Sequence, residues 1–227
     1  MAGEKPLAIV AGAGAGLGQA LLARFEAGGM VPVGLGRSRP DTCVGVFHEM
    51  DLSDPVAMSD CLSALIAAHG PPRIVVHNAA ELVIAPFDKT TLADFQRTWA
   101  SMVGALVVLG QSVLQPMVRG GGGALIVSGA TASLRGGAQF GAFASAKFAL
   151  RGLTQSLARE YQPAGVHVAH VVLDGIIDTA RSRDLHDMDP AKMMRTEDIA
   201  EAYWNLAHQP KSTWTHELDL RPASEAF

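Results

Sequence analysis

The sequence contains little cysteine, few aromatic residues and few charges. Only Cys43 and Cys61 are cysteines among its 227 residues, and their spacing matches no metal-ligand motif. This scarcity argues against a disulfide framework and a metal site, and it favours reduced thiols in a cytoplasmic protein. Charged residues make up 18% and aromatic residues 6% of the chain, and we find neither an internal repeat nor a linker between domains.

Positive charge is not in excess either. The formal net charge is −4 and the isoelectric point is near 6.0. A protein that binds nucleic acid or an anionic membrane surface is typically basic, so we expect neither kind of partner. No apolar run approaches the roughly 20 residues that a membrane-spanning helix needs.

Short apolar runs typical of strands alternate regularly along the chain with longer segments typical of helices. With 48% hydrophobic residues there is ample material for one core, and we predict a single domain over residues 1–227. The alternation predicts one doubly wound parallel sheet of about seven strands, Rossmann-like, with helices on both faces. The predicted strands are 7–11, 31–36, 44–50, 73–77, 124–127, 166–173 and 217–221. The predicted helices are 19–25, 55–69, 91–118, 139–161 and 199–208, with a loop or short helix over 181–194.

A glycine-rich turn joins the first strand to the first helix. Gly12, Gly14, Gly16 and Gly18 stand at every second position, with Leu17 among them. Glycine allows a tight turn and a close approach of another group, and a helix N-terminus attracts a pyrophosphate. This pattern predicts a dinucleotide site. A flexible linker or a signal peptide remains the alternative on the glycines alone.

The end of the second strand bears on which dinucleotide binds. An acidic residue there bonds the ribose hydroxyls of NAD, whereas an arginine accommodates the 2′-phosphate of NADP. This strand ends at Gly36, which has no carboxylate, and Arg37 follows. NADP(H) is therefore favoured over NAD(H), with a solvated basic turn as the alternative.

Two more strand ends carry candidate cofactor contacts. Asp51 and Leu52 follow the third strand, where the carboxylate is placed to receive the adenine amino group; Ser53 is equally a candidate N-cap for the next helix. After the fourth strand, Asn78 and Ala79 are small enough to pass beside a cofactor. His77 precedes them, and we interpret it as a structural histidine rather than an acid–base group.

Taken together, these segments resemble the short-chain dehydrogenase/reductase family over essentially the whole chain. Gly12, Gly16 and Gly18 match its TGxxxGxG turn, with Ala11 in place of the threonine. The sequence HNAA at 77–80 stands where the family shows NNAG, FASAK at 143–147 where it shows YxxxK, and DGIIDT at 174–179 where it shows PGxxxT. Asp51 matches the acidic residue after the third strand.

The resemblance implies an enzyme that transfers hydride between a nicotinamide cofactor and a small-molecule substrate. Lys147 would bond the cofactor ribose, and Gly175, Ile177 and Thr179 would lie beside the carboxamide. It also implies a homodimer or homotetramer, because the family pairs subunits through long central helices.

The family's proton-transfer residues are replaced in this sequence. Its catalytic tyrosine corresponds to Phe143, its serine to Ala130, and its helix asparagine to Ser101, three residues before Gly104. The resemblance therefore implies an atypical member in which Lys147 alone is retained. Missing acid–base groups typically forfeit about 10²–10⁴ in rate.

Two residues are candidate replacements for the missing proton donor. Asp174 stands where the family has proline, and a desolvated carboxylate can act as acid or base; a turn residue is the alternative. Thr131 adjoins Ala130, and its hydroxyl can hold a carbonyl oxygen. The sequence leaves three hypotheses open: an NADP(H)-dependent oxidoreductase with a non-standard proton-transfer site, a catalytically silent NADP-binding sensor or protein partner, and a structural subunit that binds no nucleotide.

Overall fold

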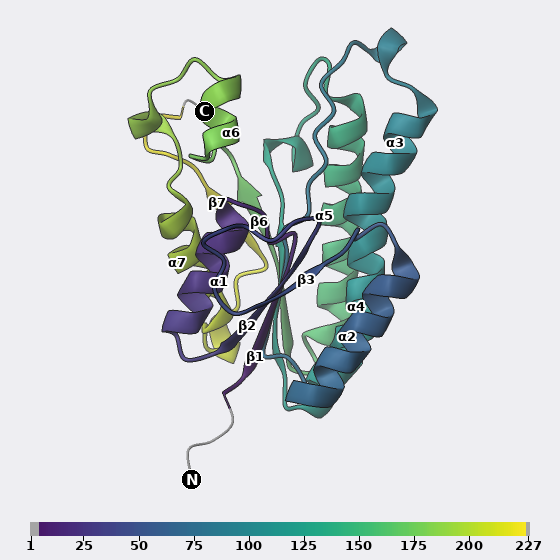
Figure 1. The fold of residues 1–227 in the computed structure, drawn as a ribbon, viewed down its shortest axis with the longest axis vertical. Coiled ribbons are helices and arrows are strands. Elements are labelled where there is room, and N and C mark those ends of the chain that lie inside the picture. Colours follow the sequence, from purple (N-terminus) through teal and green to yellow (C-terminus); the bar gives the residue numbers. More distant parts are fainter. Residues whose placement is uncertain (1–4, 226–227) are drawn as a thin grey trace.

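The computed structural model describes residues 5–225 and shows a seven-stranded parallel sheet (Figure 1). Its strand order is β3-β2-β1-β4-β5-β6-β7, and every neighbouring pair is parallel. This confirms the predicted Rossmann-like class. The strands are β1 Leu7–Ala11, β2 Val31–Gly36, β3 Val46–Glu49, β4 Ile74–His77, β5 Gly123–Ser128, β6 Val166–Leu173 and β7 Glu217–Leu220.

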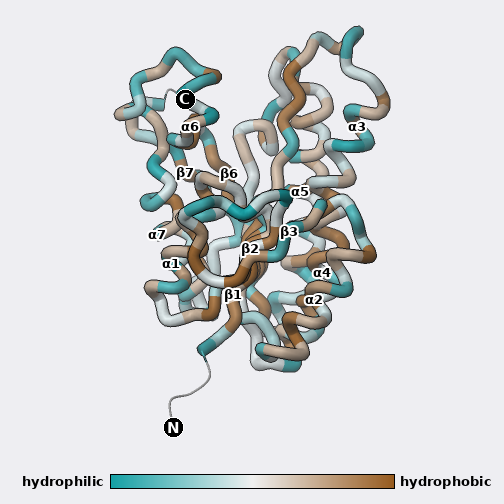
Figure 2. Tube along the Cα trace, viewed as in Figure 1, coloured by the Kyte–Doolittle hydropathy of each residue, from teal (hydrophilic) through white to brown (hydrophobic). Residues whose placement is uncertain are grey.

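Helices cover both faces of the sheet. One layer contains α1 and α7, and the opposite layer contains α2, α4 and α5 (Figure 1). Alternate residues of each central strand face opposite layers, so both faces of these strands are buried. Figure 2 shows the resulting hydrophobic strand β1 between the two helical layers. The helices are α1 Leu17–Ala27, α2 Pro55–His69, α3 Leu92–Trp99, α4 Ala105–Arg119, α5 Gly141–Tyr161, α6 Ala180–Leu185 and α7 Thr196–Ala207.

The sheet reverses its winding direction between β1 and β4. From β1 the chain adds β2 and β3 on one side, and from β4 it adds β5, β6 and β7 on the other. Loops leaving the carboxyl ends of β1 and β4 therefore diverge and leave a crevice, which is where α/β sheets of this kind bind ligands. The glycine-rich turn and the segment that begins at Asn78 leave the sheet at this point.

Several predicted element boundaries were wrong. Residues 91–118 are not one α-helix, because a π-helical turn at Ala100–Gly104 separates α3 from α4. The last helix starts at Thr196 rather than Ile199, so residues 196–198 form its first turn. Asp54, not Ser53, caps α2, since its carboxylate accepts from the backbone N–H groups of Val56 and Ala57.

One helical stretch bears on the expectation about apolar length. Among the described residues, Leu92–Arg119 alone is long and apolar enough to cross a membrane by length and composition, a test that a buried core helix also passes. Half of its most apolar window is buried inside the fold, where α4 contacts α2 and α5. Burial in the core explains the composition of this helix.

Candidate functional site

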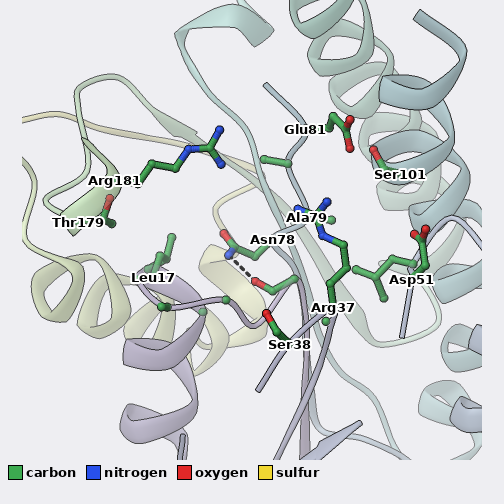
Figure 3. Close-up of a pocket in the computed structure, with 18 of the residues that line it drawn as sticks. Leu17, Arg37, Ser38, Asp51, Asn78, Ala79, Glu81, Ser101, Thr179 and Arg181 are labelled. Atoms are coloured by element: carbon green, nitrogen blue, oxygen red, sulfur yellow. Dashed lines mark hydrogen bonds between the residues drawn. The ribbon is translucent and has the colours of Figure 1, made fainter. Parts of the chain in front are cut away.

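A cavity of about 550 Å³ opens at the carboxyl ends of β1, β2 and β4 (Figure 3). Its walls come from six segments that are distant in sequence: the glycine-rich turn, the end of β2, the start of the loop after β3, the loop after β4, the end of α3 with the π-helical turn, and the segment after β6. The predicted residues that line it are Gly12, Gly14, Gly16, Leu17, Gly18, Arg37, Asp51, Leu52, Asn78, Ala79, Ser101, Ile177 and Thr179. The tertiary structure thus brings together all but two of the predicted cofactor-binding residues.

The glycine-rich turn is crowded at its base and open at its tip. Gly12 has a φ of +91°, and a β-carbon added to it would lie 2.5 Å from the backbone nitrogen of Ala79. A β-carbon on Gly18 would lie 2.6 Å from the Cα of Ala13, whereas one on Gly14 would meet nothing within 4 Å. The turn therefore packs tightly against the sheet and leaves free space above Gly14, inside the cavity.

The N-terminus of α1 faces this free space. Its N-cap, Gly16, has no side chain to bond the first backbone N–H groups of the helix. These donors carry the positive end of the helix dipole, which suits a phosphate group. A diphosphate needs free space and N–H donors. The open tip at Gly14 provides the space and the uncapped N-terminus of α1 provides the donors, so the residues present fit a dinucleotide.

Asn78 fastens two walls of the cavity together. Its Nδ2 donates a hydrogen bond of 3.0 Å to the carbonyl oxygen of Gly12, and its own backbone N–H donates to Ala11 at 2.7 Å (Figure 3). The loop after β4 is thereby held against the glycine-rich turn. Sequence reasoning placed Asn78 beside the cofactor but did not find this bracing contact.

Arg37 and Asp51 lie at one end of the cavity (Figure 3). The Oδ1 of Asp51 accepts from the backbone N–H of Ser53 at 2.9 Å and from its hydroxyl at 2.8 Å. These two hydrogen bonds lower the pKa of the Asp51 carboxyl below its usual value, and the charge of Arg37 adds a smaller effect. The ionised carboxylate of Asp51 and the planar guanidinium of Arg37 are therefore neighbours at this end of the cavity.

Ser101 lies in the π-helical turn and also lines the cavity, next to Glu81 (Figure 3). Its hydroxyl bonds the backbone oxygen of Thr98 at 3.3 Å. Glu81 and Arg97 lie close by and form an ion pair of 2.6 Å. Turns of the π type often mark functional positions, but periodicity alone could not separate this one from the surrounding α-helix.

Lys147 is buried and does not line the cavity. Its side chain is 3% exposed, and its Nζ donates a hydrogen bond of 2.8 Å to the backbone oxygen of Ser128. Burial lowers the pKa of this amine to about 8. The ring of Phe143 lies 5.6 Å from the Nζ, within the range of a cation–π contact.

Asp174 and Thr131 are bonded directly to each other. The hydroxyl of Thr131 donates to Oδ1 of Asp174, and the guanidinium of Arg221 approaches Oδ2 at 3.1 Å. Asp174 is buried while Thr131 is half-buried. The two candidate replacements therefore form one unit, anchored by an arginine that sequence reasoning missed because it follows an edge strand 47 residues later.

The remaining predicted residues pack around this unit. Ala130 donates its backbone N–H to the hydroxyl of Ser133 at 3.1 Å, and Phe143 packs against the hydrophobic core. Gly175 lies against Pro222, where a β-carbon would approach to 2.6 Å. None of these residues lines the cavity. Within residues 5–225 there is no cluster of side chains that could hold a metal ion.

The sheet, its reversal point and the cavity define a Rossmann-like α/β protein. A family model described as short chain dehydrogenase matches residues 6–190, and the chain belongs to this short-chain dehydrogenase/reductase family. The relatives of this chain that belong to the family are oxidoreductases that act on small molecules. L-xylulose reductase of Mesocricetus auratus is 30% identical over 195 residues, which cover 82% of this chain and 78% of that protein.

Two further comparisons agree with this family assignment. Sorbitol dehydrogenase of Cereibacter sphaeroides is 30% identical over 130 residues, covering 57% of this chain and 50% of that protein. The crystal structure of a short-chain dehydrogenase from Rhodopseudomonas palustris is 34% identical, with a TM-score of 0.78 and coverage of 95% of this chain and 98% of that one.

Proposed function

We propose that this protein is an NADP(H)-dependent oxidoreductase that exchanges hydride with a small carbonyl, alcohol, imine or activated alkene. The observation that carries the proposal is the cavity itself, in which an uncrowded glycine tip, an uncapped helix N-terminus and Arg37 line one continuous space. Two solved structures of the same fold are described as complexes with NADP, at 24% and 18% identity. They support a nicotinamide cofactor here.

The proposal assigns separate tasks to the cofactor and the chain. The nicotinamide, when bound, supplies or accepts hydride. Arg37 would bind the 2′-phosphate, Asp51 would bind the adenine, and Ile177 and Thr179 would contact the carboxamide. Lys147, which donates to the Ser128 carbonyl, would reach the ribose only after its side chain moves.

We further propose that the proton-transfer site is non-standard. In this interpretation Phe143 and Ala130 occupy the positions of the family's tyrosine and serine, and Ser101 occupies that of its asparagine. The Asp174–Thr131 unit would then hold and move the proton, because it contains a buried carboxylate bonded to a hydroxyl. The guanidinium of Arg221 lies 3.1 Å from the other carboxylate oxygen and holds the unit in place.

A turnover assay with NADPH and NADP⁺ against carbonyl, imine, alkene and alcohol panels tests this proposal. We expect oxidation or reduction of at least one substrate class, and we expect loss of that turnover in the double variant Asp174→Asn with Thr131→Val. Retained turnover in the double variant would remove both residues from the mechanism. Asp219→Asn is a matched control, because Asp219 also pairs with Arg221 but is not part of the unit.

A catalytically silent NADP-binding sensor or protein partner is the second candidate. The burial of Lys147 and the pairing of Asp174 with Arg221 favour it, since both groups already have partners inside the protein. Tight NADPH binding without turnover on any panel would select this function. A thermal-shift titration tests both candidates, because a ligand at about 100 times its Kd adds about 2.7 kcal/mol of stability. If NADPH adds no stability at any concentration, both candidates fail.

Replacing Arg37 should change cofactor preference. In Arg37→Gln we expect the Kd for NADPH to rise about tenfold and the Kd for NADH to stay unchanged, because only NADPH carries the 2′-phosphate. Calorimetric titration with both cofactors measures this. Arg39→Gln is the control, since Arg39 is exposed two residues away and does not line the cavity. An equal effect of both variants on NADPH would contradict the role of Arg37.

The proposal includes a single-domain, cytoplasmic homodimer or homotetramer. We infer that α4 and α5 supply a subunit contact, because the small residues of α5 suit close helix packing and Phe148 on this helix is 44% exposed. Sedimentation of wild type and Phe148→Glu tests this contact, and an unchanged assembly state would contradict it.

A further inference from the structure

Three arginines line the cavity, and their charges are balanced differently. Arg97 forms ion pairs with Glu81 at 2.6 Å and with Asp94 at 2.7 Å. Arg37 lies beside Asp51. Within residues 5–225, the guanidinium of Arg181 has neither a hydrogen bond nor an ion pair, and Figure 3 shows it extended over the cavity. The charge of Arg181 is therefore balanced by no ion pair in the part of the chain that the structure describes.

A second arginine on the same short helix shows the opposite arrangement. Arg183 bonds both oxygens of Asp178, at 2.6 and 2.8 Å, and does not line the cavity. The two arginines are exposed to a similar degree and differ in where they point and what they contact. This difference provides a matched control within one turn of helix.

The backbone around Arg181 is fixed against the glycine-rich turn. The Cγ2 of Thr179 would lie 2.9 Å from a β-carbon on Gly16, the N-cap of α1. Ile177 and Met194 form a β-bridge, with hydrogen bonds of 2.8 Å that join Asp178 and Ile176 to Met194. These contacts hold the start of α6 beside the N-terminus of α1.

We propose that Arg181 binds the diphosphate bridge of NADP(H) from the side opposite the N-terminus of α1. This inference rests on the proposed function and adds a second positive group to the cradle. The N-terminus of α1 would supply N–H donors on one side of the diphosphate. The Arg181 guanidinium would supply a planar pair of donors on the other side, and both match phosphate oxygens. The glycine tip between them is too small to obstruct either contact. Arg181 thus differs from Arg37, which would bind only the 2′-phosphate.

Three ligands separate these two arginines. NADPH has both the 2′-phosphate and the diphosphate, NADH has only the diphosphate, and adenosine 2′-monophosphate has only the 2′-phosphate. In Arg181→Gln we expect the Kd values for NADPH and NADH to rise about tenfold, with adenosine 2′-monophosphate unaffected. In Arg37→Gln we expect NADPH and adenosine 2′-monophosphate to bind more weakly, with NADH unaffected. Arg181→Lys should restore part of the affinity, because it keeps the charge without the fork.

Calorimetric titration of the three ligands into wild type, Arg181→Gln, Arg181→Lys and Arg183→Gln performs the test. Equal Kd values in Arg181→Gln and Arg183→Gln would overturn the inference while leaving the cofactor proposal intact. An equal loss for all three ligands would overturn it as well, because it would indicate a general effect of the charge and not a contact with the diphosphate. A wild-type chain that binds none of the three would overturn both proposals.

Discussion

Lowering the pH from about 7.5 to about 5 should destabilise the fold by about 4 kcal/mol through two buried histidines. Burial lowers the pKa of His77 to about 3 and that of His170 to about 4. In the unfolded chain both titrate near 6.5, so between these values the unfolded state binds more protons than the folded state. Stability therefore falls as the pH decreases below 6.5, by about 2 kcal/mol for each imidazole at pH 5.

The structure shows why both imidazoles stay neutral. His77 and His170 are in register on either side of Val127, so they point to the same face of the sheet, toward α5. Both are fully buried, and the charge of Lys147 on α5 opposes their protonation. Opposing effects are smaller: the backbone of Met102 favours protonation of His77, and Glu217 favours that of His170. Arg151 and His216 add further repulsion at His170.

Urea unfolding at both pH values measures this effect. The wild type should lose about 4 kcal/mol, and the double variant His77→Met with His170→Met should lose much less, because it lacks the two imidazoles whose pKa values burial lowers most. His69→Gln is the control, since His69 is exposed at the end of α2 and its replacement should leave the wild-type loss unchanged. An equal loss in wild type and the double variant would show that other groups cause the acid sensitivity.

Replacing Gly12 with alanine should cost about 3 kcal/mol or more of unfolding free energy. The backbone there has a φ of +91°, which strains a residue with a β-carbon. The new β-carbon would also lie 2.5 Å from the Ala79 nitrogen and 2.6 Å from the Asn78 carbonyl carbon, and neither backbone atom can rotate away. The glycine-rich turn would separate from the loop after β4, and NADPH binding should be lost.

Gly14→Ala is the matched control for this prediction. A β-carbon on Gly14 meets nothing within 4 Å, so the stability should change by less than about 0.5 kcal/mol. NADPH affinity should still fall, because the methyl group enters the cavity that Gly14 lines. Chemical denaturation and cofactor titration of both variants separate the two roles. A Gly12→Ala protein with an unchanged unfolding midpoint would show that the turn can shift at no cost.

The proposed cofactor-binding and proton-transfer residues occupy different places in the fold. The proposed cofactor contacts line one cavity, whereas Lys147 and the Asp174–Thr131 unit lie outside its wall. The space proposed for a nucleotide is therefore open, whereas the groups proposed for proton transfer are bonded to other protein groups. This arrangement makes the binding experiments with Arg37 and Arg181 independent of any assay of turnover.

Most of the fold could be predicted from the sequence because its signals are local. Buried parallel strands are continuous apolar runs, and the predicted limits of the second and sixth strands and of the second helix agree with the structure. The ends of other elements depended on contacts that no local pattern encodes. The π-helical turn at Ala100–Gly104 and the cap by Asp54 are examples.

The sequence by itself determined the family, the sheet and the identity of most cavity residues, because strand ends and glycine spacing are written in consecutive residues. Only the tertiary structure decided which side chains meet across the fold. It joined Thr131 and Asp174 to Arg221, placed Lys147 against the Ser128 carbonyl, and left Arg181 over the cavity while pairing Arg183. These contacts depend on distances between residues far apart in the chain, which the packing of the sheet and helices sets.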